Sequence, residues 1–339
     1  MKQLVITSPG SISVKDISPN DPSPDEVAVK VDSCGICGTD LHIVKGEYLG
    51  DYPVIPGHEL SGTISSIGTE VTGFKEGDRV AVEPNISCGT CGQCLKGKTN
   101  FCANWTAVGV TRPGGFAEYV NVPAKNVFSI GALPFEQAVF MEPLSCVIHG
   151  IEKLNTGKGT AAFVAGAGPV GNLIIQVLAA KGAEVHAGEI SSHRREQAAL
   201  NGACRVFDTS KSFNQIIEEF PDKYDIAVDA TGIPSVMENL VSLVKPGGEI
   251  LLFGVPPGDS KITLNPFYLF KNGITIFTSY TSADNSEQAI HLLSSGSVIT
   301  DTLISHTVAL GEFESGITYV EDPDTYNTMK VLVSPGEIK

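Results

Sequence analysis

Apolar and polar positions follow two different patterns along the chain. Up to about residue 145, short apolar stretches such as Glu26–Val31 and Arg79–Val82 are repeatedly interrupted by turn residues, which is typical of a β-rich, loop-heavy unit. From about residue 148, short apolar strands alternate with segments of helical spacing, which predicts a parallel sheet with helices on both faces. The expected strands are Ala161–Ala165, Glu184–Gly188, Tyr224–Asp229, Glu249–Gly254 and Ile274–Thr278, and the expected helices are Pro169–Lys181, Ser192–Leu200 and Met237–Val244.

The final ~55 residues return to the mixed pattern of the first part, with the alternating unit inserted between them. A chain of 339 residues exceeds the size at which one hydrophobic core usually stops growing. We therefore expect two domains of an α/β protein. The first domain is discontinuous, with residues 1–147 and 283–339, and residues 148–282 form a doubly wound parallel sheet.

Composition limits the possible partners and compartment. The hydrophobic fraction of 42% and charged fraction of 18% are those of an ordinary globular protein. A net charge of −15 disfavours nucleic acid or an anionic membrane as partner, because either would require a basic face. The start of the sequence lacks the features of a signal peptide, and no apolar run approaches the ~20 residues of a membrane span. A cytoplasmic location is expected, where the eight cysteines would be ligands, catalytic groups or buried thiols.

A glycine-rich run stands where the first strand of the alternating unit meets the first helix. This run is Gly166-Ala167-Gly168-Pro169-Val170-Gly171. Gly166 would permit the tight turn, Gly168 would let a pyrophosphate approach the backbone, and Gly171 would let helix and strand pack closely. The alternative is a glycine-rich turn without a ligand, but strand, spacing and helix agree with dinucleotide binding.

An acidic residue is expected about 20 residues after the glycine run, at the end of the second strand, to bind the adenosine ribose. Glu189 occupies that place, and a carboxylate there favours NAD over NADP. Three basic residues nearby, His193, Arg194 and Arg195, could meet a phosphate, but a solvated face is the preferred interpretation of such a cluster. Of the three, only Arg194 is kept as a cofactor candidate. Thr231, just after the strand that ends at Asp229, is assigned to the same site.

Four cysteines fall within one short loop. Cys88, Cys91, Cys94 and Cys102 are spaced as C-x2-C-x2-C-x7-C. Four thiolates on one loop suit the closed tetrahedral coordination of a structural zinc ion, whereas an iron–sulfur cluster or free thiols are the alternatives. We therefore expect a structural zinc lobe over residues 88–102, with no open position for chemistry.

Further metal-ligand residue types occur at scattered positions before residue 145. They are Cys34 and Cys37 in the run 34–42, His58 and Glu59, and Glu142. Catalytic zinc uses about three mixed nitrogen, sulfur and oxygen ligands and keeps a position for water or substrate. Taken singly, each of these residues can also be an ordinary buried side chain. Their spacing alone does not decide between the two interpretations.

The order of motifs resembles the zinc-containing medium-chain dehydrogenases along essentially the whole chain. Besides the four-cysteine loop and the glycine run, the matching segments are residues 34–42 (Cys-Gly-Ile-Cys-Gly-Thr-Asp-Leu-His), 56–59 (Pro-Gly-His-Glu), 77–80 (Gly-Asp-Arg-Val), 114–119 (Gly-Gly-Phe-Ala-Glu-Tyr) and 245–248 (Lys-Pro-Gly-Gly). The resemblance implies a β-rich GroES-like catalytic domain, a Rossmann cofactor domain, NAD, and two zinc ions per chain, one catalytic and one structural. Glu142, in Glu-Pro-Leu-Ser, resembles the sorbitol dehydrogenase branch, whereas residues 109–114 and 41–43 resemble threonine dehydrogenases.

The resemblance also implies roles for individual residues. Cys37, His58 and Glu59 resemble the catalytic zinc ligands of the polyol branch, and Glu142 resembles a fourth carboxylate that binds zinc directly or through its water. The remaining implied roles concern orientation and proton transfer: Asp40 as hydrogen-bond partner of the zinc-bound histidine, Thr39 as acceptor of the substrate proton, and His42 as the end of a relay to solvent.

The implied function is oxidation of a secondary alcohol of polyol type by NAD, in a homo-oligomer that is a dimer or tetramer. Sorbitol itself is disfavoured, because residues 277–282 lack the arginine of the polyol-binding Arg-Tyr pair and Ile43 replaces a frequent tyrosine. Oxidation of threonine or a butanediol is the alternative, with Arg112 as the one candidate carboxylate clamp. A non-catalytic, NAD-sensing relative is the alternative from another class.

Overall fold

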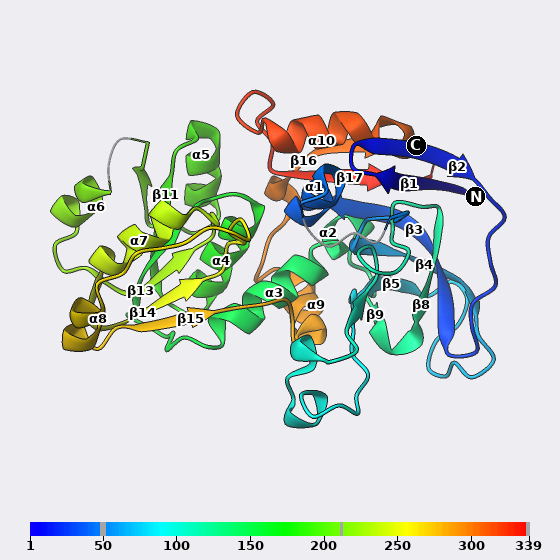
Figure 1. The fold of residues 1–339 in the computed structure, drawn as a ribbon, viewed down its shortest axis with the longest axis horizontal. Helices are drawn as coiled ribbons and strands as arrows, with labels where there is room; N and C mark the ends of the chain where they lie inside the picture. Colours follow the sequence, from blue (N-terminus) through cyan, green and yellow to red (C-terminus); the bar gives the residue numbers. More distant parts are fainter. Residues whose placement is uncertain (48–51, 211–212, 337–339) are drawn as a thin grey trace. The chain divides into compact units, whose positions relative to one another are not determined.

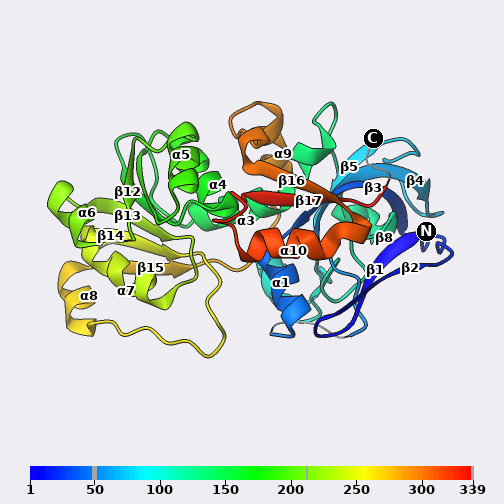
Figure 2. The same cartoon turned by 90° about the horizontal axis from the view of Figure 1, so that it is seen from above.

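The computed structural model describes residues 1–47, 52–210 and 213–336 (Figures 1 and 2). The chain forms two compact units. Unit 1 comprises residues 1–145, 282–296 and 300–339, and unit 2 comprises residues 146–281 and 297–299. Within the described ranges, no helix is both long enough and apolar enough to span a bilayer.

Unit 2 is built on a six-stranded sheet in the order β12-β11-β10-β13-β14-β15, and all neighbouring strands are parallel. Its strands are β10 (Ala161–Ala165), β11 (Glu184–Glu189), β12 (Arg205–Asp208), β13 (Tyr224–Asp229), β14 (Val244–Leu252) and β15 (Thr275–Thr278). Its helices are α4 (Pro169–Ala180), α5 (Ser192–Leu200), α6 (Asn214–Glu219), α7 (Pro234–Leu243) and α8 (Pro266–Asn272). Figure 2 shows α4 and α5 on one side of this sheet and α7 on the other. The predicted doubly wound architecture is confirmed.

The central strands of this sheet are apolar because helices cover both faces. Phe163, in β10, is fully buried against Tyr224, with ring centroids 5.2 Å apart. Sequence patterning missed β12, α6 and α8, which are short or carry few apolar positions. The predicted strand Glu249–Gly254 also begins too late in the sequence, because β14 starts at Val244 and includes the Lys-Pro-Gly-Gly run.

Unit 1 is β-rich, as predicted. Its main sheet has the order β16-β17-β3-β4-β5-β9, with β8 also paired to β3. The pairs are antiparallel except β16 with β17. Its strands are β1 (Lys2–Ser8), β2 (Ser11–Asp16), β3 (Glu26–Ile36), β4 (Glu59–Ile67), β5 (Arg79–Val82), β6 (Asn85–Ile86), β7 (Thr106–Ala107), β8 (Tyr119–Pro123), β9 (Val127–Ser129), β16 (Ile304–Ala309) and β17 (Lys330–Ser334).

Unit 1 also contains short helices. The α-helices are α1 (Gly38–Lys45), α2 (Phe135–Ala138), α9 (Ser286–Ser294) and α10 (Phe313–Glu321), while α3 (Met141–Ile151) runs across the boundary between the units. Of these, α2 and α10 pack against strands of the main sheet. The 3-10 helices are η1 (Cys94–Lys96), η2 (Thr99–Phe101), η3 (Ala124–Asn126), η4 (Asp301–Leu303) and η5 (Leu310–Glu312).

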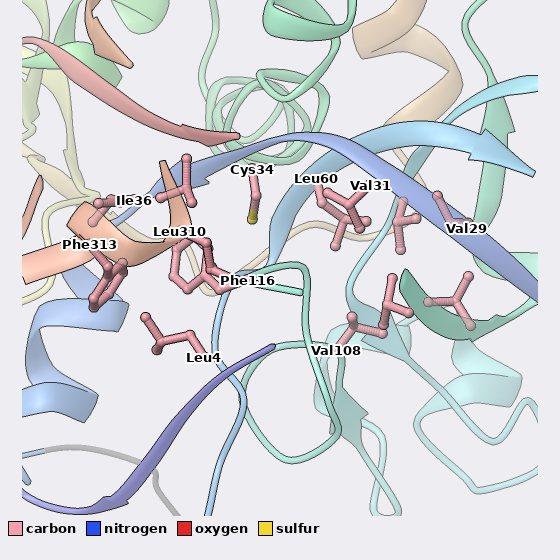
Figure 3. Close-up of a cluster of buried hydrophobic side chains, with 14 of the residues drawn as sticks. Leu4, Val29, Val31, Cys34, Ile36, Leu60, Val108, Phe116, Leu310 and Phe313 are labelled. Atoms are coloured by element: carbon pink, nitrogen blue, oxygen red, sulfur yellow. The ribbon is translucent and has the colours of Figure 1, made fainter. Parts of the chain in front are cut away.

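The core of unit 1 joins residues from both ends of the chain. Figure 3 shows Cys34 and Leu60 beside Phe116, with Phe313 from the C-terminal part packed against the same cluster. The rings of Phe116 and Phe313 lie 4.9 Å apart. In the main sheet, β17 pairs with β3, aligning Val331 with Ile36. The returning C-terminal segment is therefore part of the same fold as the first 145 residues.

Candidate active site and metal centres

The first metal-ligand cluster begins where β3 ends and α1 starts. Cys37 is the residue before α1, and its backbone N–H donates to the Asp40 carboxylate at 2.9 Å. The other Asp40 oxygen accepts from the Gly57 N–H at 3.2 Å, and Asp40 is fully buried. Asp40 thus ties the start of α1 to the segment that carries His58.

His58 and Glu59 complete this cluster. Donor atoms of Cys37, His58 and Glu59 all lie within 4.8 Å of one another, and the two latter side chains are buried. The His58 Nδ1 atom lies 3.8 Å from the Asp40 carboxylate, which is close enough for charge attraction but beyond hydrogen-bond distance. Burial alone would lower the pKa of His58, but Asp40 and Cys37 hold that pKa well above its ordinary value. A thiol, an imidazole and a carboxylate form the mixed donor set of catalytic zinc.

Lys330 is a member of this neighbourhood that sequence reasoning missed. Its Nζ donates to both Glu59 oxygens, at 2.7 and 2.6 Å, and to the Ile36 carbonyl at 3.3 Å. Burial alone would lower the pKa of Lys330, but Glu59, together with Cys37 and Glu142, raises it. The only sequence signal for this buried charge was a lysine at the start of the apolar run Lys330–Ser334. That signal is weak, because a lysine at the end of a strand is usually exposed.

The fourth predicted carboxylate lies near but outside the cluster of three. Glu142 lies in the first turn of α3 and is buried, and its charge acts on Lys330. It is not among the three residues whose donor atoms lie within 4.8 Å of one another. A buried carboxylate outside the group of three suits the expected role of contacting a metal through its water molecule better than that of a direct ligand.

Thr39 and His42 lie on α1, immediately after Cys37. The Thr39 hydroxyl lies 4.0 Å from the Cys37 sulfur, so a proton acceptor stands beside a ligand atom. His42 is half-exposed, and its Nδ1 lies 2.9 Å from the Glu47 carboxylate. The helix ends at Gly46, whose left-handed backbone turns Glu47 back towards His42. Both side chains are partly exposed, so a proton taken up by the hydroxyl lies within reach of solvent.

Cys34 lies in β3 and is fully buried in the hydrophobic core of unit 1 (Figure 3). A Cβ placed on Gly57 or on Gly115 would lie 2.8 or 3.0 Å from its sulfur. Burial, and then the charges of Asp40 and Glu59, raise the pKa of this thiol well above its ordinary value. Cys34 is therefore a protonated packing residue.

The second cluster is the four-cysteine loop. Donor atoms of Cys88, Cys91, Cys94 and Cys102 lie within 4.8 Å of one another, and all four are free thiols. Cys91 and Cys94 have their sulfurs 3.5 Å apart, which is much longer than the disulfide bond length of about 2.05 Å. Hydrogen bonds from Thr90 lower the pKa of Cys88 to about 5, whereas burial and the neighbouring thiols raise the pKa of Cys94 to about 11. The donor set and spacing fit a closed structural zinc site.

The glycine run of unit 2 has the shape of a phosphate cradle. Gly166 has φ +92°, and a Cβ there would lie 2.8 Å from the Thr231 methyl carbon. A Cβ on Gly171 would lie 2.1 Å from the Gly166 carbonyl oxygen, so helix and strand need glycine at both positions. Gly168 precedes α4, whose first residue is Pro169 followed by Val170, and no backbone bulk blocks its N-terminal N–H groups.

Glu189 is buried beside this cradle and is fully engaged by the backbone. One carboxylate oxygen accepts from the Ala167 N–H at 2.8 Å, and the other accepts from Ile190 and Ser191 at 2.8 and 3.0 Å. It therefore links the glycine run to the segment after β11. The Arg194 guanidinium lies 3.9 Å from where a Gly168 Cβ would be, at the mouth of the cradle.

The neighbouring predicted residues have defined partners. Arg195 donates to the Glu189 and Ile190 carbonyls, and its guanidinium lies 3.4 Å from Asp208. The Thr231 hydroxyl donates to Asp229 at 2.6 Å, which shapes the turn facing Gly166. Of the three basic residues at this end of α5, Arg194 is the one that the geometry brings to the glycine run.

Comparison with known proteins gives two family matches along the chain. Residues 23–132 match the alcohol dehydrogenase GroES-like domain, and residues 169–295 match the zinc-binding dehydrogenase domain. The first match contains most of the metal-ligand residues, and the second begins inside the glycine run.

Individual relatives match nearly the full chain. D-altritol 5-dehydrogenase of Agrobacterium fabrum is 35% identical and covers 98% of each chain, and D-arabinitol dehydrogenase 1 of Uromyces fabae is 34% identical over 92% of this chain and 90% of its own. A crystal structure of a zinc-binding dehydrogenase from Sinorhizobium meliloti 1021 bound to NADP has a TM-score of 0.94 and 33% identity, covering 98% of this chain and 99% of that one.

Proposed function

The chain belongs to the zinc-binding dehydrogenase family, and from this premise we propose that it oxidises the secondary hydroxyl of a polyol with NAD. The C–H bond of the alcohol carbon breaks, and its hydrogen moves with both electrons to the nicotinamide ring. The hydroxyl gives up its proton to solvent and its oxygen becomes a carbonyl oxygen. The products are a ketone, NADH and one proton.

The residues of the first cluster divide this work among them. Cys37, His58 and Glu59 would hold the catalytic zinc, which supplies positive charge that lowers the pKa of the alcohol. Asp40 orients His58 from behind, and Glu142 lies ready to receive a hydrogen bond or to join the ligands. Thr39 takes the hydroxyl proton, and His42 with Glu47 passes it to water.

The cofactor preference for NAD rests on Glu189. Its carboxylate lies at the end of β11, where the ribose of a dinucleotide would reach, and a negative charge there repels the additional phosphate of NADP. Arg194 would contact the pyrophosphate at the glycine run. Because the Sinorhizobium relative was crystallised with NADP, the assay must compare both cofactors. We expect Glu189→Ala to lower the preference for NAD by about 10-fold, or about 1.4 kcal/mol.

A polyol is favoured as the substrate class by the relatives and by one ion pair. Two relatives that match over nearly the whole chain oxidise altritol and arabinitol by name. The threonine alternative needs a carboxylate clamp, and its one candidate, Arg112, already donates to Glu26 at 2.5 Å. Since Arg112 is committed to this pair, it does not offer a free guanidinium for an amino acid.

The observation that carries the proposal is the buried cluster of Cys37, His58 and Glu59 with Asp40 behind the imidazole. The test is NAD reduction by the purified protein on a panel of four-, five- and six-carbon polyols, sugar-alcohol phosphates, butanediol and threonine. We expect one polyol group to give the highest kcat/KM, with loss of activity after zinc removal. If protein holding two zinc ions per chain oxidises no secondary alcohol, the proposal is wrong and a cofactor-sensing role replaces it.

A homo-oligomer is part of the proposal. β15 is an edge strand of the unit 2 sheet, and exposed apolar side chains accompany it in the same unit, including Val255, Phe267 and Phe270. An open strand edge beside exposed aromatic residues is the surface that a second copy of the chain would cover. Light scattering should give a dimer or tetramer, and Phe270→Glu should lower that mass.

The thiolate ligands favour a reducing compartment, and we propose the cytoplasm. Both metal clusters depend on cysteines that must stay reduced to bind zinc. Fractionation of cells expressing a tagged chain tests this location, and recovery in a secreted fraction would contradict it.

A further inference from the structure

Lys330 forms an ion pair in a place where a charged residue is costly. Its side chain is 5% exposed and that of Glu59 is 1% exposed, so water solvates neither charge. Both Glu59 oxygens accept hydrogen bonds from its Nζ, and the Ile36 carbonyl accepts a third. Burying such a pair gives no general gain in stability over an apolar pair. The position therefore calls for an explanation other than stability.

The surrounding backbone fixes this pair in one arrangement. Gly35 aligns with Glu59 across β3 and β4, and a Cβ on Gly35 would lie 2.2 Å from a Glu59 oxygen. Val331, next to Lys330, aligns with Ile36 across β17 and β3. Glu59 is thus held by the strand on one side and by the lysine at its oxygens.

A charge count shows what the lysine changes. When a metal is bound, Cys37, Glu59 and Glu142 each carry one negative charge, and His58 is neutral. A divalent ion alone would leave this group of residues with one excess negative charge. The buried Asp40 carboxylate beside His58 adds to this excess, and Lys330 lowers it by one charge at the anion that it contacts, Glu59.

We propose that Lys330 is a positioning residue that keeps Glu59 ion-paired, so that a zinc ion held by Cys37, His58 and Glu59 retains its polarising power and an exchangeable position for the alcohol. This inference rests on the proposed function. Without the lysine, Glu59 would give its full charge to the metal. The metal would then be held more tightly and would attract the alcohol oxygen less.

The experiment compares Lys330→Met with Lys330→Arg in the zinc-loaded protein. In Lys330→Met we expect chelator-driven release of one of the two zinc ions to slow by about 10-fold, within the range of changes at residues behind metal ligands. The kcat per zinc-loaded site should fall by at least about 10-fold, with the KM for NAD unchanged. Lys330→Arg keeps the charge, and both rates should stay close to those of the unchanged protein. Cobalt-substituted protein should show an altered visible spectrum only for Lys330→Met.

A matched control uses a lysine of another ion pair. Lys245 pairs with Asp225 at 2.6 Å in unit 2, and Lys245→Met should change neither zinc release nor kcat. If Lys330→Met folds poorly, the double variant Glu59→Gln with Lys330→Met removes both charges. It should fold and release zinc without the slowing, because the freed carboxylate that causes the slowing is gone.

The possible outcomes separate this inference from the proposed function. If zinc release from Lys330→Met is unchanged or faster while kcat per loaded site is unchanged, Lys330 only supports packing and the inference is wrong. The same holds if the double variant releases zinc as slowly as Lys330→Met. If the unchanged protein oxidises no alcohol but Lys330→Met still slows zinc release, the inference on Lys330 stands and the proposed function fails.

Discussion

The two metal-ligand clusters of unit 1 are built in opposite ways. The cysteines at 88, 91, 94 and 102 come from one loop of fifteen residues, and three of the four are only half-buried. Cys37, His58 and Glu59 come from the ends of separate elements, and the lysine beside them lies 271 residues further along the chain. A local loop can bind its metal without the rest of the fold, whereas the assembled cluster exists only when β3, β4 and β17 are paired.

This difference predicts that the assembled cluster serves catalysis and the four-cysteine loop serves stability. Variants that separate these two roles should have the largest effects. Cys37→Ala should lower kcat by about 1,000-fold or more, because several kcal/mol of charge stabilisation are lost at 1.4 kcal/mol per tenfold. Its melting temperature should stay near that of the unchanged protein. Cys88→Ala should instead lower the melting temperature by several degrees and leave kcat per folded molecule nearly unchanged. Steady-state assays and calorimetry check both, and equal loss of folding in the two variants would contradict the division.

Metal removal should separate the same two clusters. Metal analysis should find two zinc ions per chain in the unchanged protein and one in each of Cys37→Ala and Cys88→Ala. In Cys88→Ala, chelation should abolish the remaining activity, and in Cys37→Ala it should lower the melting temperature without an activity to lose. A single zinc ion in the unchanged protein would show that one of the clusters does not bind metal.

Two glycine variants, one in each cluster, should have effects of intermediate size. A Cβ on Gly35 would lie 2.2 Å from a Glu59 oxygen, so Gly35→Ala must displace a carboxylate of the assembled cluster. We expect kcat/KM to fall by about 10- to 100-fold, as for changes behind metal ligands. Gly89, in the local loop, has φ +71° and open space around it, so Gly89→Ala should cost only about 1–2 kcal/mol of backbone strain. Equal effects of the two variants on activity would contradict the assembled origin of the site.

Arg112→Met provides the smallest expected effect. Burial alone would raise the pKa of Glu26, but hydrogen bonds from Arg112 and Ser23 hold it below its ordinary value of 4.5. A depressed carboxylate pKa stabilises the fold at neutral pH, and this stability is lost as the pH falls through the folded pKa. Arg112→Met should therefore cost about 1–2 kcal/mol in urea unfolding at pH 7, since the arginine is about a third exposed.

The difference between Arg112→Met and the unchanged protein should shrink below pH 4.5, where Glu26 becomes protonated in the unfolded chain and then in the folded one. The KM for a polyol should not change, because Arg112 has no role in the proposed site. A selective loss of threonine oxidation would instead restore Arg112 as a carboxylate clamp.

The parts of the protein that depend on local spacing were predictable. The strand Ala161–Ala165 and the helix Ser192–Leu200 were predicted with the bounds that the structure has, because the first is a short apolar run and the second follows a strand in the alternating pattern. The glycine run needs only one strand, one turn and one helix, so its sequence context identified it. Elements with few apolar positions, such as β12 and α6, gave no such signal.

The catalytic residues were harder to predict from the spacing of residues in the sequence. Cys37 is separated in sequence from the adjacent pair His58 and Glu59, and the interpretation of the three residues depended on resemblance to a family rather than on a local pattern. Glu189 was predicted as a ribose ligand, but its three bonds to backbone N–H groups depend on how the segments after β10 and β11 fold together.

The sequence by itself determined the two-part architecture, the glycine cradle and the four-cysteine loop, because each depends on residues that are neighbours in the chain. Only the tertiary structure decided which distant groups share a site. Lys330 reaches Glu59 because β17 pairs with β3, and Arg112 is paired because the fold brings Glu26 to it. A buried charge is stable only next to its partner, and the partner's identity is set by chain packing rather than by spacing.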